Sequence, residues 1–557
     1  LSLPGGAEAA SAEAADAART RRAEEVLAGR QILFGRAIEL GWPPRWDWRW
    51  NGHPQAETFA GDLRSSWEVQ RLQGLLPLAR AGAEERFALG YVEGVLDFQR
   101  CNPGPGGMAW ASALELGLRL LALAQGLPRV APSEAFAAGH VEILRVVDRH
   151  ARRLRADLSL DKVVRGNHLL GELAGLLAAG LLLPGARTSW WDGLAVRELL
   201  EAEILRQFHP DGVSVEQSLS YEKFVLEFLA LAGSLGAARG EPFAAPARAR
   251  LEAALEHLDC CAAPDGTLPV IGDCDSGRGA DWGEEDPHRL GRFVADARRG
   301  LGMEAPAGGD PAPAPGVSWR HFPEGGHGVL KAGGDYLFLR GGPFGHGIPG
   351  PASHAHADLL APVLYSGGEP VLLDPGVYGY GVGEESRDAM RAWEAHSAVS
   401  FEPPAGPVPA GTFRWRRIPP PAVLTGGLLP EGAAIEGELR PGGGGNPLLW
   451  HRSIRYNELH RAWLFLDRLS ETASGPVTWA FRFAPGVRLE QTDRAGVYRV
   501  VLPSGRLLRL TLEPVGEVRL EEGWVAPSYG SRVTAPVLRR RLGRPPAEAR
   551  TELAPLG

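Results

Sequence analysis

The stretch from Ser353 to His396 brings together several residue types that could do chemistry. It reads Ser353-His354-Ala355-His356-Ala357-Asp358, continues through an apolar run to Asp374-Pro375-Gly376, and ends at Ala395-His396-Ser397. In an extended segment His354 and His356 lie on the same side, because side chains alternate with period two. The pattern has the spacing of a metal site beside a free histidine.

The chain that must position these residues has the composition of an ordinary globular protein. Its 557 residues exceed what one hydrophobic core usually serves, so we expect two or three domains. Hydrophobic content of 44% and charged content of 23% argue against a disordered protein. The net charge of -8 argues against general nucleic-acid binding, although a local basic cleft would still hold an anionic substrate.

Neither the cysteines nor the apolar segments indicate a special environment. No CxxC spacing occurs, so neither a disulfide framework nor a cysteine metal site is predicted for Cys101, Cys260, Cys261 and Cys274. No stretch approaches the ~20 uninterrupted apolar residues of a membrane helix. We expect any signal peptide to be absent or already removed, because no charged region precedes an apolar segment. The compartment is not readable, with a periplasmic or secreted location favoured over a cytoplasmic one.

The first half of the chain is predicted to be helical. Apolar residues recur there at helical spacing, with short Pro/Gly/Asn/Asp segments between the runs. The expected helices are Ala7–Arg36, Trp67–Ala81, Arg86–Phe98, Ala109–Ala124, Glu134–Leu154, His168–Leu183, Leu194–Phe208, Phe224–Ala238 and Ala247–Leu258. Paired helices with little strand signal favour a helical solenoid or an (α/α) barrel, and no sequence repeat decides between the two.

The second half reads as strands. Residues 305–316, rich in proline, alanine and glycine, form the expected linker. Beyond it short β-rich runs alternate with turn residues, as in Tyr336–Arg340, Ala462–Asp467 and Gly496–Leu502, which favours an antiparallel sandwich. We therefore expect an α+β multidomain protein, with helices over residues 1–304 and strands over residues 317–557.

A set of short motifs carries a specific resemblance. In chain order they are Arg165-Gly166-Asn167-His168, Asp211-Gly212, Glu216-Gln217-Ser218, Tyr221, Gly272-Asp273-Cys274-Asp275, and the three groups between Ser353 and Ser397 quoted above. Each motif alone is weak, but the ordered set resembles the heparinase II/III-like polysaccharide lyases, which include oligoalginate lyases. The resemblance implies an N-terminal (α/α) toroid of paired helices followed by a C-terminal antiparallel β-sandwich.

The resemblance also implies a reaction, β-elimination at a uronic acid in a glycosaminoglycan, an alginate or a bacterial exopolysaccharide. Loss of the C5 proton builds charge on the adjacent carboxylate, which donors at Asn167 and His168 would neutralise. Tyr221 and His354 would move the protons. If the C5 proton and O4 lie on one face of the sugar, Tyr221 could serve as both base and acid. If they lie on opposite faces, His354 would be the base and Tyr221 the acid.

Residue types and spacing add candidate metal and substrate contacts, and the resemblance implies that the metal is a structural brace. His356, Asp374 and His396, with a water, would complete a tetrahedral zinc site that braces the loops and holds His354 in place. Other residues are assigned to the substrate: the candidates are Arg165, Arg387 and Arg391 for carboxylates, and Trp110, Glu115 and Arg119 as further cleft residues. For the last three a core or salt-bridge role is an equal alternative.

Plainer interpretations stand beside these roles. Asn167 could be a helix cap, Tyr221 a core tyrosine, and Asp374 the start of a turn. His354 and His356 could be surface loop histidines. Each of these alternatives explains one residue by itself. The functional interpretation is favoured because all of the motifs occur together in the order typical of the family.

Three acidic residues receive separate expectations. Asp273 and Asp275 are expected to form structural turns. Glu222 stands where relatives commonly have a basic residue, and its carboxylate would repel an anionic sugar unless it faces away.

Two other functions remain open from the sequence. A glycoside hydrolase on the same toroid would need two opposed carboxylates, for which Asp273, Asp275 and Glu216 are the candidates. A non-catalytic glycan-binding or envelope-polysaccharide biosynthesis protein would keep the fold alone. The expected partner is an anionic polysaccharide or oligosaccharide, with no nucleic acid and no membrane span. The oligomeric state is open, a homodimer being one alternative.

Overall fold

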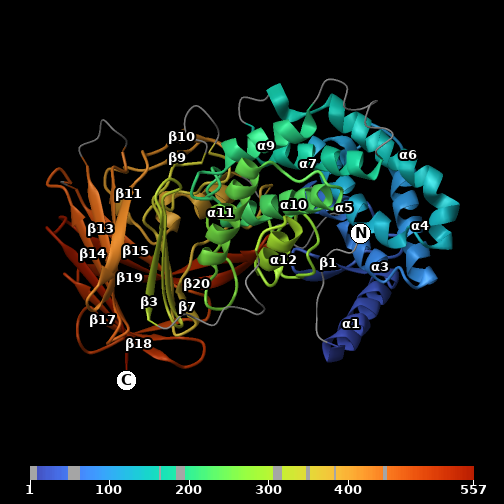
Figure 1. The fold of residues 1–557 in the computed structure, drawn as a ribbon. Coiled ribbons are helices and arrows are strands. Elements are labelled where there is room, and N and C mark those ends of the chain that lie inside the picture. The colour runs from blue at the N-terminus through green and yellow to red at the C-terminus, as the bar shows by residue number, and fades with distance from the viewer. Residues whose placement is uncertain are drawn as a thin grey trace.

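The computed structural model describes residues 9–47, 63–161, 165–183, 195–304, 316–345, 352–381, 384–442, 448–473 and 475–556. Helices fill the first half and antiparallel strands the second, as the sequence predicts (Figure 1). The predicted linker lies almost entirely outside the described residues. No helix within the described ranges is long and apolar enough to cross a membrane.

The helices form a double-layered toroid. They are α1 (Ala9–Leu27), α2 (Leu63–Gln70), α3 (Leu76–Arg80), α4 (Glu85–Cys101), α5 (Ala113–Val130), α6 (Glu134–Ala156), α7 (Asn167–Leu182), α9 (Val196–Gln207), α10 (Leu219–Ala238), α11 (Ala245–Cys261) and α12 (Phe293–Gly300). Helices α5, α7 and α10 bury nearly every residue, whereas α4, α6, α9 and α11 expose one face. The buried helices thus line the inside of the toroid.

Glycines allow the closest helix crossing. A Cβ on Gly117 of α5 would lie 2.5 Å from the carbonyl oxygen of Gly171 on α7, and one on Gly175 would lie 2.5 Å from the Cα of Gly117. Any larger side chain would push these two helices apart. The crossing fixes the position of α7, whose first residue is Asn167.

Two predicted helices are interrupted. The helix expected over Ala7–Arg36 ends at Leu27, because Gly29 adopts a φ of 89° just beyond it, and a hairpin of β1 (Arg30–Leu33) and β2 (Arg36–Glu39) follows. Phe34 and Gly35, both with positive φ, form its two-residue turn. The helix expected over Trp67–Ala81 is divided into α2 and α3, with Leu72 at a φ of 65° between them.

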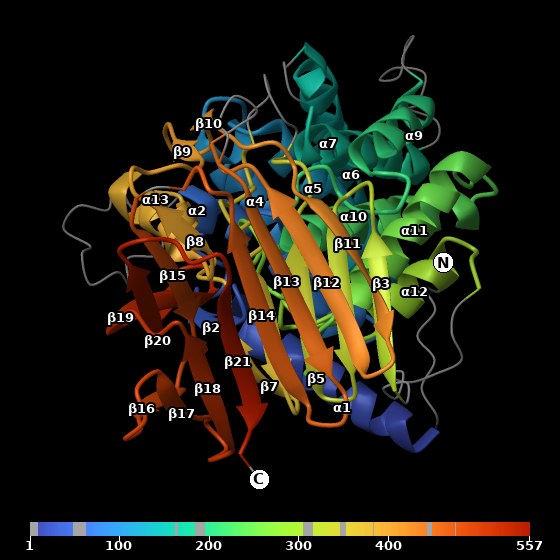
Figure 2. The same ribbon diagram turned by 90° about the vertical axis from the view of Figure 1, so that its left-hand side faces the viewer.

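Three larger antiparallel sheets make up the second half, and all of their strands are paired with neighbours of opposite direction. The middle sheet runs in the order β3 (Val317–Phe322), β4 (His327–Ala332), β5 (Asp335–Arg340), β6 (Pro362–Ser366) and β7 (Glu369–Leu372). An eight-stranded sheet, facing the viewer in Figure 2, has the order β11 (Val423–Leu429), β12 (Gly432–Leu439), β13 (Trp450–Asn457), β14 (Ala462–Leu469), β21 (Ala549–Pro555), β18 (Leu507–Glu513), β17 (Val497–Val501) and β16 (Arg488–Gln491).

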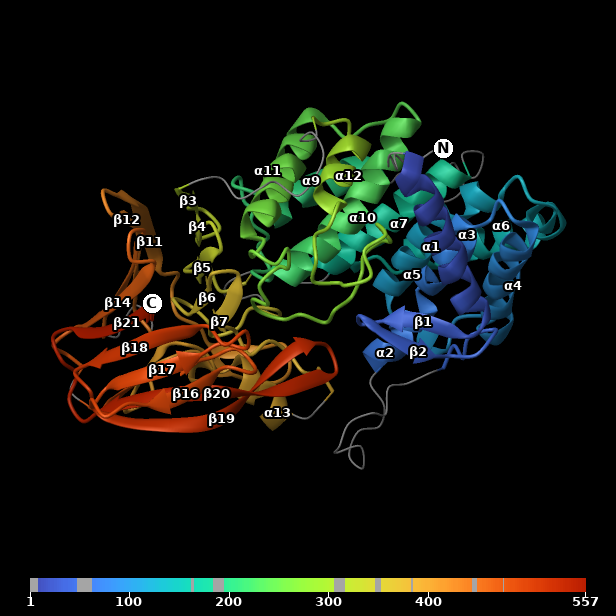
Figure 3. The same ribbon diagram turned by 90° about the horizontal axis from the view of Figure 1, so that it is seen from below.

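The third sheet and the smaller elements complete this half. The sheet has the order β19 (Glu517–Ser528), β20 (Ser531–Leu542), β15 (Val477–Arg482) and β8 (Val399–Phe401), and its long strands β19 and β20 are prominent in Figure 3. The other elements are the pair β9 (Val408–Pro409) and β10 (Trp415–Arg417), and helix α13 (Glu384–Arg391). The three strands predicted by name correspond to β5, β14 and β17.

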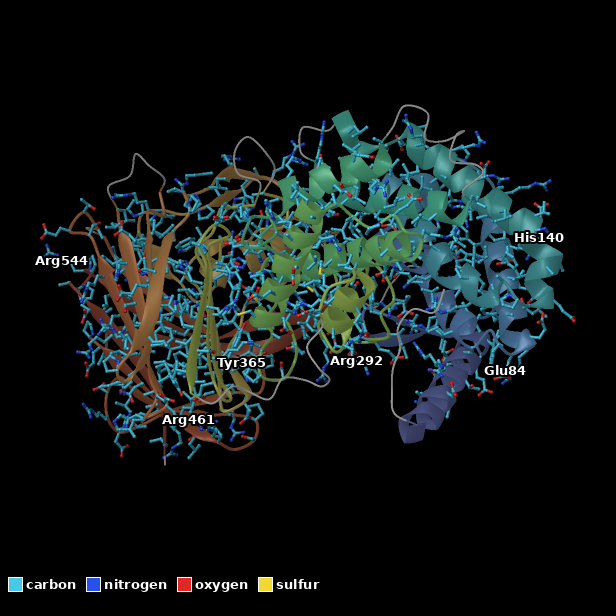
Figure 4. All side chains as sticks on the ribbon, in the orientation of Figure 1. Glu84, His140, Arg292, Tyr365, Arg461 and Arg544 are labelled. Atoms are coloured by element: carbon cyan, nitrogen blue, oxygen red, sulfur yellow. The ribbon has the colours of Figure 1, made fainter. Side chains whose placement is uncertain are left out.

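The middle sheet is buried on both faces. Phe338 of β5 and Val363 of β6 belong to the apolar core of the toroid, whereas their neighbours Leu337 and Leu364 belong to the core of the sandwich. Because side chains alternate across a strand, one sheet serves both cores. Side chains fill the space between this sheet and the helices (Figure 4). The two halves of the chain are therefore joined by a continuous apolar interface.

Candidate active site

Tyr221 lies in the first turn of α10, where the toroid meets the sheets. Ser218 caps this helix, since its Oγ accepts a hydrogen bond from the backbone N–H of Tyr221 at 3.2 Å. The same hydroxyl donates to the carbonyl oxygen of Asp273 at 2.6 Å. The cap thus sets both the start of the helix and the distance between Tyr221 and the loop at Asp273.

His354 reaches Tyr221 from the second half of the chain. The two rings are stacked, with centroids 3.7 Å apart and planes 19° from parallel. The His354 side chain is 13% exposed and Tyr221 is 8% exposed, so the pair lies at the edge of solvent. The fold therefore brings together the two side chains to which the resemblance assigns proton transfer.

Asp273 is the buried centre of the site. Its carboxylate accepts hydrogen bonds from Nδ1 of His354 at 3.0 Å and from Nε2 of His356 at 2.9 Å, and it pairs with Arg387 at 2.6 Å. Burial alone would raise its pKa, but Arg387 and the two histidines lower the pKa below the usual range. Burial would likewise lower the pKa of His354, yet the bond to Asp273 raises it. Asp273, expected to be only a turn residue, orients the imidazole.

Asp275, two residues further along the same loop, holds the Tyr221 hydroxyl. The hydroxyl donates to Oδ2 of Asp275 at 3.2 Å and lies 2.9 Å from the hydroxyl of Tyr380. Arg64 donates to the same carboxylate oxygen at 2.7 Å. Burial, with the charges of Asp275 and Asp273, holds the pKa of Tyr221 well above its ordinary value. The resting phenol is therefore protonated.

No motif in the sequence singles out Tyr380. It lies four residues beyond the Asp374-Pro375-Gly376 turn, and an aromatic residue so close to a singled-out motif was the available signal. Its ring also contacts Phe413, an exposed aromatic residue that in turn contacts His354. These rings form one wall beside the stacked pair.

Asn167 is joined to this centre through Glu216. Its backbone N–H donates to Oε1 of Glu216 at 3.0 Å, and its side-chain amide lies 3.0 Å from both carboxylate oxygens. Both residues are buried, and the charge of Glu216 helps to raise the pKa of His354, which burial would lower. The amide therefore does not cap its own helix but is held in place by a carboxylate close to the stacked pair.

His168, next to Asn167, is exposed and lines a cavity of about 530 Å³. Trp67, Ser112 and Asp157 line the same cavity. An aromatic ring together with hydroxyl, carboxylate and imidazole groups is a combination that suits a sugar.

The three predicted metal ligands are neighbours but are not closed around one point. Nδ1 of His396 lies 2.8 Å from Oδ2 of Asp374, and the ring centroids of His356 and His396 are 5.8 Å apart. Within the described residues, Nδ1 of His356 is buried without a hydrogen-bond partner. The donor chemistry and this orphaned nitrogen fit a divalent metal. The described group whose ligand atoms all lie within 4.8 Å is a different one, His257, Cys261 and His327.

Three of the predicted substrate contacts are core residues instead. Trp110 is 2% exposed and packs on His150, with ring centroids 4.6 Å apart. Glu115 accepts two hydrogen bonds from Arg71 at 2.9 and 2.8 Å. Arg119 is fully buried and donates to backbone carbonyl groups. The helical spacing places Glu115 and Arg119 on one face of the helix, as the structure confirms. The spacing does not show that this face points into the core.

Of the three arginines predicted to bind substrate, two are buried and one is exposed. Arg387 pairs with Asp273, and Arg391 pairs with Asp388 and lies over the ring of Trp415, so both are occupied by protein groups. Their expected contact with substrate is corrected to a role inside the protein. The side chain of Arg165 is 40% exposed and pairs with Glu203 at 3.3 Å, which leaves it at the surface near Asn167.

Comparison with known families places the chain. The model named Heparinase II/III N-terminus matches residues 45–285, and the model named Heparinase II/III-like, C-terminal matches residues 314–546. The chain belongs to the heparinase II/III-like family. This family of polysaccharide lyases is the one that the ordered motifs indicate. The comparison with curated proteins found no match for this chain.

Solved structures share the fold of this heparinase II/III-like protein. Heparinase III aligns with a TM-score of 0.69 at 17% identity, over 100% of this chain and 86% of that one. A mutant of the heparan sulfate lyase HepC from Pedobacter heparinus aligns at 0.62 and 18%, over 100% and 84%. The chondroitin AC lyase of Streptomyces coelicolor A3 aligns at 0.53 and 14%, over 99% and 81%. These likenesses confirm the predicted architecture of helices followed by antiparallel sheets.

Proposed function

We propose that this heparinase II/III-like protein is a lyase that cleaves a uronic-acid-containing anionic polysaccharide by β-elimination and leaves a C4=C5 unsaturated uronate. The observation that carries the proposal is the stacked pair of Tyr221 and His354 at the edge of solvent. Each member is oriented by a buried carboxylate, which is what proton transfer at a fixed position requires.

The roles follow from the contacts. Asn167, held by Glu216, and the exposed His168 would neutralise the charge that builds on the uronate carboxylate. Because Asp273 occupies Nδ1 of His354, Nε2 is the nitrogen that would face the sugar. The C5–H and C4–O4 bonds break, the C4=C5 double bond forms, and the proton is delivered to O4.

The stacking favours elimination on one face. Rings with centroids 3.7 Å apart leave no room for a sugar between them, so both side chains would approach the sugar from the same side. In that case Tyr221 would first pass its phenol proton to the Asp275 carboxylate, which accepts from it at 3.2 Å. The phenolate, stabilised by the hydroxyl of Tyr380 2.9 Å away, would then take the C5 proton and return it to O4. Polymers that differ only in configuration at C5 test this, since the favoured substrate has the C5 proton and O4 on one face.

His356, Asp374 and His396 are proposed to hold a divalent metal, for which zinc suits two imidazoles and a carboxylate. The metal would supply positive charge and rigidity to the loops around His354, two residues from His356. The proton transfers would remain with the side chains.

The test is a panel of glycosaminoglycans, alginates and bacterial exopolysaccharides. A lyase creates an ultraviolet-absorbing double bond, whereas a hydrolase yields reducing ends without it. Reducing ends alone would replace the proposal with hydrolysis, and binding without any product would replace it with a glycan-binding role. The buried, ion-paired state of Asp273 and Asp275 gives no support to opposed hydrolytic carboxylates.

A further inference from the structure

A separate group of metal-ligand side chains lies where α11 meets β4. His257 and Cys261 are one helical turn apart on α11, so they share a face, and His327 is the first residue of β4. Nε2 of His257 lies 3.0 Å from Nδ1 of His327 and 3.2 Å from Sγ of Cys261. We propose that these three residues bind a divalent transition metal, zinc by donor chemistry, which ties the toroid to the middle sheet.

The separations suit a tetrahedral ion. With ordinary zinc bond lengths, two nitrogen ligands lie about 3.3 Å apart, and a nitrogen and a sulfur about 3.6 Å apart. The two observed separations from Nε2 of His257 are shorter by only a few tenths of an ångström, and all three ligand atoms lie within 4.8 Å of one another. Small side-chain rotations would open the group around an ion, and a water molecule would complete the coordination.

The hydrogen-bonding capacity of the three side chains also favours a metal ion. Glu222 accepts a hydrogen bond from Nδ1 of His257 at 2.7 Å, so Nε2 of that ring carries a single lone pair. Without a metal, the N–H of His327 and the S–H of Cys261 both compete for it. A cation would instead accept a lone pair from each of the three groups. A carboxylate behind a ligating histidine is the usual support of such sites.

Burial and charge are consistent with an ion. His257, Cys261 and His327 are all buried, and Phe322 and Phe338 pack against the two imidazoles. A buried ion needs compensating charge close to it. A divalent ion, the thiolate and the Glu222 carboxylate would together be neutral.

The site also accounts for Glu222. This carboxylate was expected to repel an anionic sugar unless it faced away. It is buried, with its oxygens bonded to His257 and to the backbone N–H of Ser214 at 3.0 Å. One residue of α10 thus supports the proposed metal while its neighbour Tyr221 stacks on His354.

Cobalt loading of the full chain tests the proposal. The wild-type protein should show sulfur-to-cobalt charge-transfer absorption, which Cys261→Ser should lose. The adjacent Cys260→Ser is the matched control and should keep it. His396→Ala should keep it too, because the histidines and carboxylate of the other proposed site include no sulfur. Bound cobalt without this absorption, or absorption that persists in Cys261→Ser, would overturn the proposal.

Two further variants cover the case in which Cys261→Ser does not fold. His327→Gln keeps the thiol but removes a ligand, and Glu222→Gln keeps all three ligands but weakens the support of His257. We expect cobalt affinity to fall by about 10- to 100-fold in Glu222→Gln, and further in His327→Gln. Unchanged affinity in both would contradict the site. These readouts are spectroscopic, so they stand apart from any result on lyase activity.

Discussion

Asp273 and Asp275 alternate along one loop, and each holds one member of the stacked pair: Asp273 bonds the imidazole of His354, and Asp275 accepts from the hydroxyl of Tyr221. A single loop of the toroid therefore sets the positions of two side chains that come from different halves of the chain. Displacing this loop would disturb both side chains of the stacked pair at once.

Tyr221→Phe should abolish turnover and leave polysaccharide binding nearly intact. The change removes only the hydroxyl that we propose moves protons, so we expect kcat to fall by about 10²- to 10⁴-fold with little change in KM. Tyr498→Phe, at a tyrosine on β17, is the control and should behave as the wild type. A Tyr221→Phe protein with a normal rate of double-bond formation would remove this residue from the mechanism.

Asp273→Asn should lower both stability and activity. Adding Arg387→Met to this variant should restore part of the stability but none of the activity. The first change leaves the buried Arg387 without its charge partner, which costs about 3–5 kcal/mol. The double variant removes that unpaired charge, so its loss of unfolding free energy should be smaller than the sum of the losses in the two single variants. Its activity should stay low because His354 is no longer held. Denaturant unfolding and turnover would be measured in parallel, and additive stability effects would count against the buried pair.

Asn167→Ala separates a structural from a catalytic role. Losing the amide leaves Glu216 buried with fewer donors, which we expect to cost about 1–3 kcal/mol of stability. Adding Glu216→Gln should recover some of that stability, since the neutral amide is cheaper to bury. Turnover should remain about 10²- to 10³-fold down in both variants, because the proposed donor for the uronate carboxylate is missing. If activity returned together with stability, Asn167 would be structural only.

Metal analysis tests the site proposed at His356, Asp374 and His396. We expect about one equivalent of metal at this site, lost in His396→Ala together with thermal stability. His451→Ala, which removes a half-buried imidazole on β13, should retain the metal. Measuring these variants in the Cys261→Ser background isolates this site from the one at His257. If purified Cys261→Ser protein holds no metal, then His356, Asp374 and His396 are ordinary loop residues and not metal ligands.

His150 should make the protein sensitive to acid. Burial, with Arg119 nearby, lowers its pKa to about 3, whereas the unfolded chain has a value near 6.5. Below pH ~6.5 the unfolded state therefore binds one proton more, and stability should fall with a slope approaching about 1.4 kcal/mol per pH unit until the pH nears 3. His150→Phe should remove this contribution. Free energies of unfolding from pH 7 to pH 4 give the slopes, and equal slopes in both proteins would refute the assignment.

The sequence by itself determined the fold class, the order of its halves and the family. Helical spacing before the linker and short strand runs after it are local properties of the chain, and the structure agrees with both. The ordered motifs likewise contained Asn167, Tyr221 and His354 before any contact was known. These features could be predicted because each is recorded in neighbouring residues.

Only the tertiary structure decided which polar residues face the site. Periodicity placed Glu115 and Arg119 on one helical face, but packing turned that face into the core. Asp273 reads as a turn until the sheet half brings two imidazoles and Arg387 onto it. The spacing of His257 and Cys261 on α11 does not by itself indicate a metal site, because the third ligand, His327, comes from another element. Contacts between distant elements depend on how whole surfaces fit, and that information is not held in any one segment.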